Sequence, residues 1–326
     1  MHARWFLKLI RWNDWGDSKL PLFFLIYYYL ILVHDHVRLL NLILLIPLAV
    51  FFASFFSFGY FLNDHFDKSV DMIACKENVM SHLPNWQQML ALTCALSTSL
   101  VAFFPFYQYS SATTLLFLSY LSSILYSTPP FRLKEKGLLG IACASLVQRV
   151  LPVLIVFSIF GHFGFDALIF AVFSFLLGLR WILVHQLLDR NKDIQAKVET
   201  FVAIRTPERT YSLMLFLFAL EIASAMALVG TITYHTSLLL VPLPITYLLY
   251  ELYLYPLWKR FGFKRMLCSY DFAPLADFYF FWLPFSISII LGWLNPSFFV
   301  ISALEILWKI RYVRYDIGLI RLRSNV

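Results

Sequence analysis

Residues 39–71 read LLNLILLIPLAVFFASFFSFGYFL and continue directly into NDHFDKSVD. The first 24 residues of this stretch carry no charged side chain, and a helix that crosses a bilayer needs about 20 mainly apolar residues. The nine residues that follow contain three aspartates. The stretch therefore predicts a transmembrane helix over residues 39–62 that ends in a cluster of carboxylates.

Similar apolar runs fill most of the 326-residue chain, of which 60% is hydrophobic and only 14% charged. Soluble domains carry about 25% charged residues, so this composition excludes a soluble or disordered chain and a disulfide-rich secreted domain. The basic residues form no continuous stripe, so no nucleic-acid partner is expected. The runs are continuous and lack the alternating polarity of transmembrane strands. Further helical spans are predicted over residues 19–33, 86–104, 111–126, 138–160, 166–188, 211–229, 237–258 and 277–294.

These runs predict an all-α integral membrane protein, a bundle of nine or ten transmembrane helices that forms a single domain over residues 1–326. The N-terminal segment 1–18 mixes Trp, Phe and Leu with Arg and Lys, which is typical of a helix that lies on a membrane surface. The C-terminal segment 297–326 is predicted to hold a tenth span or an interfacial helix.

The distribution of basic residues predicts the orientation of this bundle. The loops after the even-numbered spans and the N-terminal segment hold eighteen Lys and Arg residues, whereas the loops after spans one, three, five and seven hold only Arg38. Cytoplasmic loops of membrane proteins carry such an excess of positive charge. The sequence therefore predicts that the acidic end of residues 39–71 faces the cytoplasm.

The first acidic cluster has the spacing of one helix face. Asn63, Asp67 and Asp71 are each four residues apart, and Asp64 lies beside them. Carboxylates this close repel one another unless a cation is present. Hard divalent ions such as Mg²⁺ bind oxygen ligands and commonly share them with substrate phosphates. The cluster is therefore a candidate site for a metal ion and a diphosphate.

A second acidic cluster, HQLLDRNKD, closes the predicted span 166–188. Asp189 and Asp193 are again four residues apart, and His185 lies one turn earlier on the same face. Either cluster alone could be a solvated helix end. Two clusters of similar spacing on the same predicted side favour a shared metal–diphosphate site, and their separation suggests two related four-helix halves.

Three motifs then carry a resemblance. NDHFDKSVD is similar to the NDxxDxxxD motif of the UbiA superfamily of intramembrane prenyltransferases, and DRNKD is similar to its second, DxxxD motif. Between them, YSTPPFRLKEKGLLG (residues 126–140) resembles the family's YSxPPxRLKxxG loop. The resemblance implies a helical bundle around a central cavity, with Mg²⁺ and an isoprenyl diphosphate at its cytoplasmic mouth.

The resemblance also implies roles for individual residues. Tyr126, Arg132 and Lys134 are expected to act on the departing diphosphate. The expected ligands of Mg²⁺ are Asn63, Asp64, Asp67, Asp71, Asp189 and Asp193. Apart from the resemblance, substrate-binding roles are predicted for polar residues in or near the predicted site: Asn63, Lys68, Lys76, Arg149, His185 and Lys197.

The chain departs from the family's pattern at two places. Many members follow the first motif with an Arg-Pro-rich stretch, whereas this chain reads MIACKENVMSHLP, with Lys76 as its only Lys or Arg. In the second region Lys197 stands where Gly or Asp is commoner. Both departures concern the acceptor substrate more than the diphosphate site.

Two arginines fall inside predicted spans, where charged side chains are costly and commonly functional. Arg149 is predicted either to line the cavity or to pair with Glu221 or Glu251. Arg180 is half a helical turn out of phase with Asp189, so we expect it to point away from the acidic site.

The function predicted from these features is Mg²⁺-dependent transfer of an isoprenyl group from a diphosphate to an aromatic or lipid acceptor within the membrane. A terpene cyclase of the same superfamily is the alternative, since the altered Arg-Pro stretch and 61 aromatic residues are compatible with it. A transporter or lipid carrier is the remote alternative, which would show broken helices at the midplane.

Overall fold

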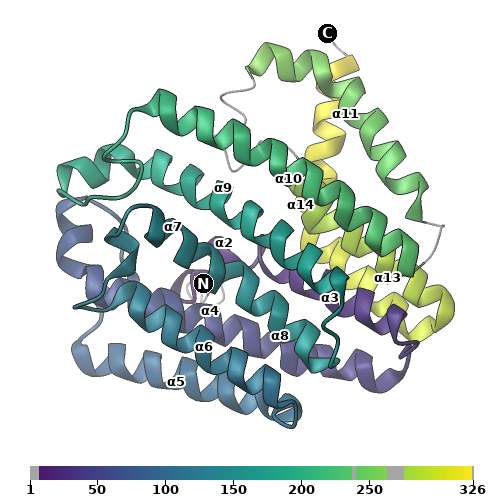
Figure 1. Cartoon of the computed structure of the whole chain (residues 1–326), viewed down its shortest axis with the longest axis horizontal. Helices are drawn as coiled ribbons and strands as arrows, with labels where there is room; N and C mark the ends of the chain where they lie inside the picture. The colour runs from purple at the N-terminus through teal and green to yellow at the C-terminus, as the bar shows by residue number, and fades with distance from the viewer. Residues whose placement is uncertain (1–6, 237–239, 263–274, 325–326) are drawn as a thin grey trace. The chain divides into compact units, whose positions relative to one another are not determined.

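The computed structural model describes residues 7–236, 240–262 and 275–324, and these residues form helices and no strands (Figure 1). The predicted all-helical fold class is therefore confirmed for the described part of the chain. The helices divide into two compact units, one of residues 1–16 and 44–224 and the other of residues 17–43 and 225–326. Both acidic motifs lie in the first unit, so the two units do not coincide with the predicted four-helix halves.

The first unit contains most of the long helices. In chain order its elements are α2 (Trp12–Trp15), α4 (Leu39–Ile73), η1 (Val79–His82), α5 (Asn85–Phe103), η2 (Phe104–Phe106), α6 (Ser110–Ser127), η3 (Leu133–Glu135), α7 (Leu138–Ser145), η4 (Leu146–Val150), α8 (Leu151–Ile159), α9 (Phe165–Gln195) and α10 (Pro207–His235), the last of which continues into the second unit.

The length of α4 determines where its acidic end lies. Its 35 residues span about 50 Å at 1.5 Å per residue, whereas the hydrocarbon core of a bilayer is about 30 Å thick. The helix therefore extends beyond the apolar part of a membrane by several turns. The 31-residue α9 does the same, and both helices carry an acidic motif in their last turns.

The α7–η4–α8 segment forms the interior of the first unit, with α7 packed on α9 and α8 packed on α6. Gly178 permits the close approach of α9, because a Cβ atom there would lie 2.2 Å from the Ser145 hydroxyl. That hydroxyl in turn donates a 2.7 Å hydrogen bond to the Phe175 carbonyl. The small side chains at this crossing therefore set the position of α9 and its acidic end.

The second unit consists of α3 (Leu20–Val33), α11 (Pro242–Phe261), η6 (Phe278–Trp282), α13 (Leu283–Leu294), η7 (Pro296–Phe298) and α14 (Phe299–Ser324). In this unit α13 packs against α3 and α14. The backbone of α14 leaves helical geometry at Lys309, whose ammonium pairs with Asp17 at 3.2 Å. The predicted C-terminal segment thus contains one helix with a kink at a buried lysine.

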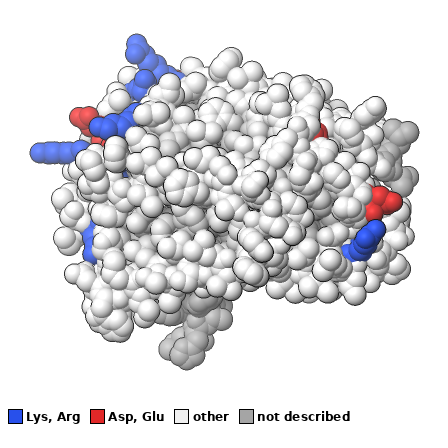
Figure 2. Space-filling view, turned by 60° about the horizontal axis from the view of Figure 1, so that its bottom comes forward, with Lys and Arg blue, Asp and Glu red and all other residues white. Residues whose placement is uncertain are grey.

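Five helices of the described residues are long and apolar enough to cross a membrane: Leu39–Ile73, Asn85–Phe106, Leu138–Ile159, Phe165–Gln195 and Pro207–His235. Two shorter helices, Leu20–Val33 and Phe278–Leu294, are also apolar. Most atoms on the face drawn in Figure 2 belong to uncharged residues, which suits contact with lipid. The chain therefore has the features of an integral membrane protein, and the nine or ten crossings stay a prediction.

Candidate functional site

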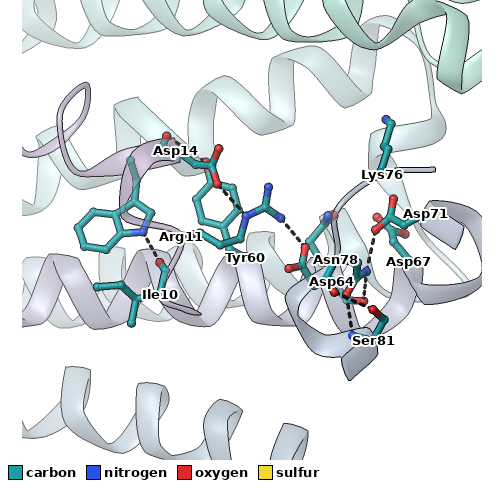
Figure 3. Close-up of polar contacts among 12 residues, drawn as sticks. Ile10, Arg11, Asp14, Tyr60, Asp64, Asp67, Asp71, Lys76, Asn78 and Ser81 are labelled. Atoms are coloured by element: carbon teal, nitrogen blue, oxygen red, sulfur yellow. Dashed lines mark hydrogen bonds and ion pairs between the residues drawn. The ribbon is translucent and has the colours of Figure 1, made fainter. Parts of the chain in front are cut away.

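The first acidic motif occupies the last turns of α4, where helical spacing places its polar side chains together. Asp64 is 1% exposed and Asp67 is 8% exposed, so both carboxylates are removed from water. Asp71 lies one turn further on and accepts a 2.7 Å hydrogen bond from the Asn78 amide (Figure 3). Buried carboxylates are costly unless they are paired, so the surrounding cations and donors decide what this motif can do.

The loop between α6 and α7 brings two cations to Asp67. Arg132 approaches one carboxylate oxygen to 3.0 Å, and Lys134 donates to the other. The same ammonium donates a 2.9 Å hydrogen bond to Asn63 Oδ1. Both cations come from one short loop, in which Leu133–Glu135 form a tight 3₁₀ turn directly after Arg132.

Two backbone features hold this loop in place. Arg132 has the left-handed φ of 37°, which turns the chain back toward α4. Gly140 in α7 lies against the loop, because a Cβ atom there would be 2.6 Å from the Leu133 carbonyl oxygen. A side chain at Gly140 would push the loop away, so a close contact between backbones explains this glycine, which lies three residues beyond the glycine of the motif.

The second acidic motif ends α9, and one lysine neutralises both of its aspartates. Lys76 Nζ lies 2.9 Å from Asp189 Oδ2 and 2.7 Å from Asp193 Oδ1. Asp193 also accepts a 3.0 Å hydrogen bond from the Thr200 hydroxyl. Burial lowers the pKa of Lys76, but the hydrogen bonds and charges of the two aspartates outweigh it, so this pKa lies above its ordinary value. Lys76 therefore remains a cation at physiological pH.

Lys76 also joins the two motifs, because it follows directly from the end of α4. The chain reverses after α4 through Cys75, which has a left-handed φ of 50°, and Lys76 N donates to the Asp71 carbonyl at 2.8 Å. Asn78 then caps η1 by accepting from Ser81 N at 3.0 Å, while its amide holds α4 (Figure 3). The departure from the family's Arg-Pro stretch is thus the segment that connects the two carboxylate clusters.

The other predicted residues lie at varying distances from these carboxylates. His185 is 61% exposed, and its Nε2 lies 3.8 Å from Asp189. Lys68 donates a 2.8 Å hydrogen bond to the Gln88 side chain. Tyr126 is half-buried in the last turn of α6, and Lys197 is exposed just after α9. The roles assigned to these four residues stay predictions.

One of the two carboxylates suggested as a partner of Arg149 is occupied by another arginine. Glu221 pairs with Arg180, through two guanidinium–carboxylate contacts of 2.5 and 2.8 Å. Both members of this pair are at most 1% exposed on their side chains. Sequence spacing had placed Arg180 away from the acidic site but could not show which helix carries its counter-ion. Arg149 is buried in η4 at 3% exposure.

Sequence reasoning missed three contributors to the site, namely Arg11, Asn78 and Thr200. Arg11 Nη1 lies 2.5 Å from Asp64 Oδ1, although it belongs to the segment that was predicted to lie on the membrane surface (Figure 3). Asn78 and Thr200 bond to Asp71 and Asp193, as described above. Asn78 and Thr200 follow their motifs by seven residues, and short polar side chains at such positions are a usable signal of caps and turns.

The carboxylates of this site fit a divalent cation that is shared with a diphosphate. Within residues 7–236, 240–262 and 275–324, no three His, Cys, Asp or Glu side chains are close enough together to hold a metal ion. Mg²⁺ usually takes only one or two carboxylates and completes its shell with phosphate oxygens and water. The buried Asp64 Oδ2 has no hydrogen-bond partner in the described part of the chain, so one carboxylate oxygen is available for such an ion.

The fold is similar to solved structures of a UbiA homolog from Archaeoglobus fulgidus. The structure bound to DMAPP and Mg²⁺ has a TM-score of 0.52 and 15% identity, and the match covers 97% of this chain and 98% of that chain. The structure bound to GPP and Mg²⁺ has a TM-score of 0.52 and 16% identity, with coverage of 97% and 99%. A third structure of this homolog has a TM-score of 0.53 and 18% identity, with coverage of 97% and 99%.

No match to this chain is found among curated proteins. The model of the UbiA prenyltransferase family matches residues 21–256, a range that contains both acidic motifs and the loop between them. This match confirms the resemblance seen in the three motifs, and the similar structures agree with the helical fold. The chain belongs to the UbiA prenyltransferase family.

Proposed function

We propose that this protein transfers an isoprenyl group from a prenyl diphosphate to an acceptor within the membrane, in a Mg²⁺-dependent reaction. The observation that carries the proposal is the convergence of Arg132 and Lys134 on Asp67 and Asn63, beside a buried Asp64 oxygen that has no hydrogen-bond partner among the described residues. Cations and carboxylates arranged in this way suit a metal-bound diphosphate. The DMAPP and GPP bound by the Archaeoglobus fulgidus homolog support this class of substrate.

Each group of residues has a part in the proposed reaction. Asn63, Asp64, Asp67, Asp71, Asp189 and Asp193 would hold Mg²⁺, which supplies Lewis-acid neutralisation of the diphosphate when it is bound. Arg132 and Lys134 would exchange their contacts with Asp67 for contacts with the diphosphate oxygens. Their positive charge stabilises the negative charge that develops as the C–O bond breaks.

In this step the diphosphate leaves with the electron pair of the C–O bond and the prenyl carbon becomes an allylic cation. A nucleophilic carbon or heteroatom of the acceptor then forms the new bond and loses a proton. The apolar helices that surround the site would exclude water, which would otherwise capture the cation. We place the acidic end of α4 on the cytoplasmic side, because the flanking loops carry most of the basic residues.

Product analysis tests the proposed transfer against cyclisation. Purified protein would be incubated with Mg²⁺ and prenyl diphosphates of several chain lengths, with and without aromatic or lipid acceptors, and the products would be separated by mass. A prenylated acceptor that forms only when the acceptor is present supports transfer. A cyclic hydrocarbon formed without an acceptor would instead assign the chain to the cyclases, and no release of diphosphate under any condition would refute both.

A further inference from the structure

The N-terminal segment of residues 7–16 packs against α4 beside the first acidic motif (Figure 3). Trp15 anchors it, because its side chain is 0% exposed and its ring stacks on Phe56 with centroids 6.0 Å apart. The Trp15 indole also donates a 2.7 Å hydrogen bond to the Ile10 carbonyl, which closes the segment into a compact turn. A buried tryptophan contributes a large apolar contact area, and its indole N–H is satisfied here, so Trp15 favours this placement of the segment.

This turn aims Arg11 at Asp64. The guanidinium donates from Nη1 to Asp64 Oδ1 at 2.5 Å and from Nε to Asp14 Oδ2 at 2.7 Å. It also lies over the ring of Tyr60, with Cζ 4.9 Å from the ring centroid. The backbone of Arg11 has a left-handed φ of 55°, which residues other than glycine rarely adopt. Three contacts and a strained backbone together indicate that the position of this guanidinium is well determined.

The two oxygens of Asp64 are in different situations. Oδ1 is held by Arg11, whereas the buried Oδ2 has no hydrogen-bond partner among the residues that the structure describes. An ionised carboxylate has lone pairs on both oxygens and can bind two cationic groups at once.

We propose that Arg11 is a positioning residue of the metal–diphosphate site, which fixes the Asp64 carboxylate through Oδ1 and directs Oδ2 toward the divalent cation. This inference rests on the proposed function, because it concerns the same site. With this role for Arg11, the N-terminal segment contributes to the metal–diphosphate site in addition to any contact with the membrane surface. Groups that bond to the ligands of a metal ion typically change the affinity for that ion 10- to 100-fold when they are removed.

An opposite role for Arg11 predicts the opposite sign. A guanidinium that merely occupied Asp64 in place of the metal would compete with it, so its removal would strengthen metal binding. If Arg11 instead positions Asp64, its removal weakens metal binding. The direction of the change in metal affinity therefore shows whether Arg11 positions Asp64 for the metal ion or competes with the metal ion for it.

The experiment measures Mn²⁺ binding to the full-length, detergent-solubilised protein by electron paramagnetic resonance, with and without a non-hydrolysable prenyl thiodiphosphate. Arg11→Ala should weaken Mn²⁺ binding about 10- to 100-fold, and Arg11→Lys should recover part of the loss because it keeps the charge but not the planar fork. In turnover assays the Mg²⁺ concentration for half-maximal rate should rise more than the rate at saturating Mg²⁺ falls.

Lys8→Ala is the matched control, since it removes one positive charge from the same segment. Lys8 pairs with Glu77 at the surface, where the two side chains are 60% and 71% exposed. Its Mn²⁺ affinity should equal that of the unmodified protein. Asp14→Asn, which loosens Arg11 without removing it, should weaken binding by a smaller factor and provides a second variant if Arg11→Ala does not fold.

Unchanged or tighter Mn²⁺ binding in folded Arg11→Ala or Asp14→Asn protein would overturn the inference. A loss equal in Lys8→Ala and Arg11→Ala would overturn it as well, because the effect would then come from net charge. The proposed function fails separately, if the unmodified protein binds Mn²⁺ in an Arg11-dependent way but releases no diphosphate from any prenyl substrate.

Discussion

The two acidic motifs end α4 and α9 in the same unit, yet their charges are balanced in different ways. Around the first motif, Arg11 contacts Asp64 while Arg132 and Lys134 contact Asp67, so the cations come from two separate segments. At the second motif Lys76 contacts both aspartates. The first motif can lose one cation and keep others, whereas the second depends on a single lysine. Substitutions in the two motifs should therefore have different consequences.

The largest effect is expected at Asp67, which is the meeting point of the loop cations. Asp67→Ala should lower turnover of prenyl diphosphate about 100- to 1,000-fold, as removal of one electrostatic group from an active site commonly does. The measurement is release of diphosphate at saturating Mg²⁺. Asp67→Asn keeps the size of the side chain and serves as the control for packing. Near-normal turnover in both variants would remove Asp67 from the site.

The next effect concerns stability and separates the two motifs. Lys76→Met leaves Asp189 and the buried Asp193 without this cation, and should lower the free energy of unfolding by about 1–3 kcal/mol without divalent ions. Arg132→Met should cost less than about 1 kcal/mol, because Lys134 still neutralises Asp67.

Chemical unfolding of both variants in detergent, at pH 7 and without divalent ions, measures this difference. Added Mg²⁺ should restore more stability to Lys76→Met than to Arg132→Met, because the ion can replace the missing positive charge. Equal losses in the two variants would show that the second motif does not depend on one lysine.

As the pH rises, Lys134 at the first motif should lose its proton before Lys76 at the second motif does. Burial lowers the pKa of Lys134, and the attraction of Asp67 only partly offsets it, so this pKa lies below 10.5, whereas that of Lys76 lies above 10.5. A group whose folded pKa is raised stabilises the fold fully below its unfolded pKa and loses that contribution only as the pH passes the folded value. As the pH rises, turnover should therefore begin to decline before pH 10.5 is reached, while Lys76 still stabilises the fold.

A pH profile of turnover in Lys134→Arg measures this order, because arginine stays charged throughout the range. Its alkaline limb should move to higher pH than that of the unmodified protein. The stability difference between the unmodified protein and Lys76→Met should stay constant from about pH 6 to 9. An alkaline limb that does not move in Lys134→Arg would exclude Lys134 as the group that limits turnover.

The smallest effect is expected at His185. Its ring is 61% exposed and lies 3.8 Å from Asp189, beyond the distance of a hydrogen bond. His185→Ala should change turnover less than about twofold, as exposed and weakly paired side chains usually do. The assay is the same diphosphate release. A tenfold loss of turnover would mean that His185 contacts the substrate. The second motif would then have a role in the reaction beyond the contacts of its two aspartates with Lys76.

The fold and the location of the site were largely predictable from local features of the chain. The uninterrupted apolar runs predicted the helices, and four-residue spacing predicted that Asn63, Asp67 and Asp71 share a face of α4. The motif of residues 126–140 placed Arg132 and Lys134 together on one short loop. All of these features depend on residues within about ten positions of one another, where helix periodicity and turn chemistry apply directly.

Contacts between distant segments were not predictable in the same way. Arg180 pairs with Glu221, 41 residues away, and Arg11 reaches Asp64 from the N-terminal segment. Neither the position of a charged residue in its own segment nor the spacing of its neighbours shows which distant segment carries its partner. Only the packing of the helices selects among them, because the energy of an ion pair depends on burial and distance.

The sequence by itself determined that this protein is a helical membrane protein with two carboxylate clusters, because hydrophobic length and helical spacing are properties of short stretches. The tertiary structure alone decided which cation faces which carboxylate: Lys76 on Asp189 and Asp193, Arg132 and Lys134 on Asp67, and Arg11 on Asp64. These pairings arise where α4, α9, the loop after α6 and the N-terminal segment pack together, since burial forces each carboxylate to take the nearest available positive charge.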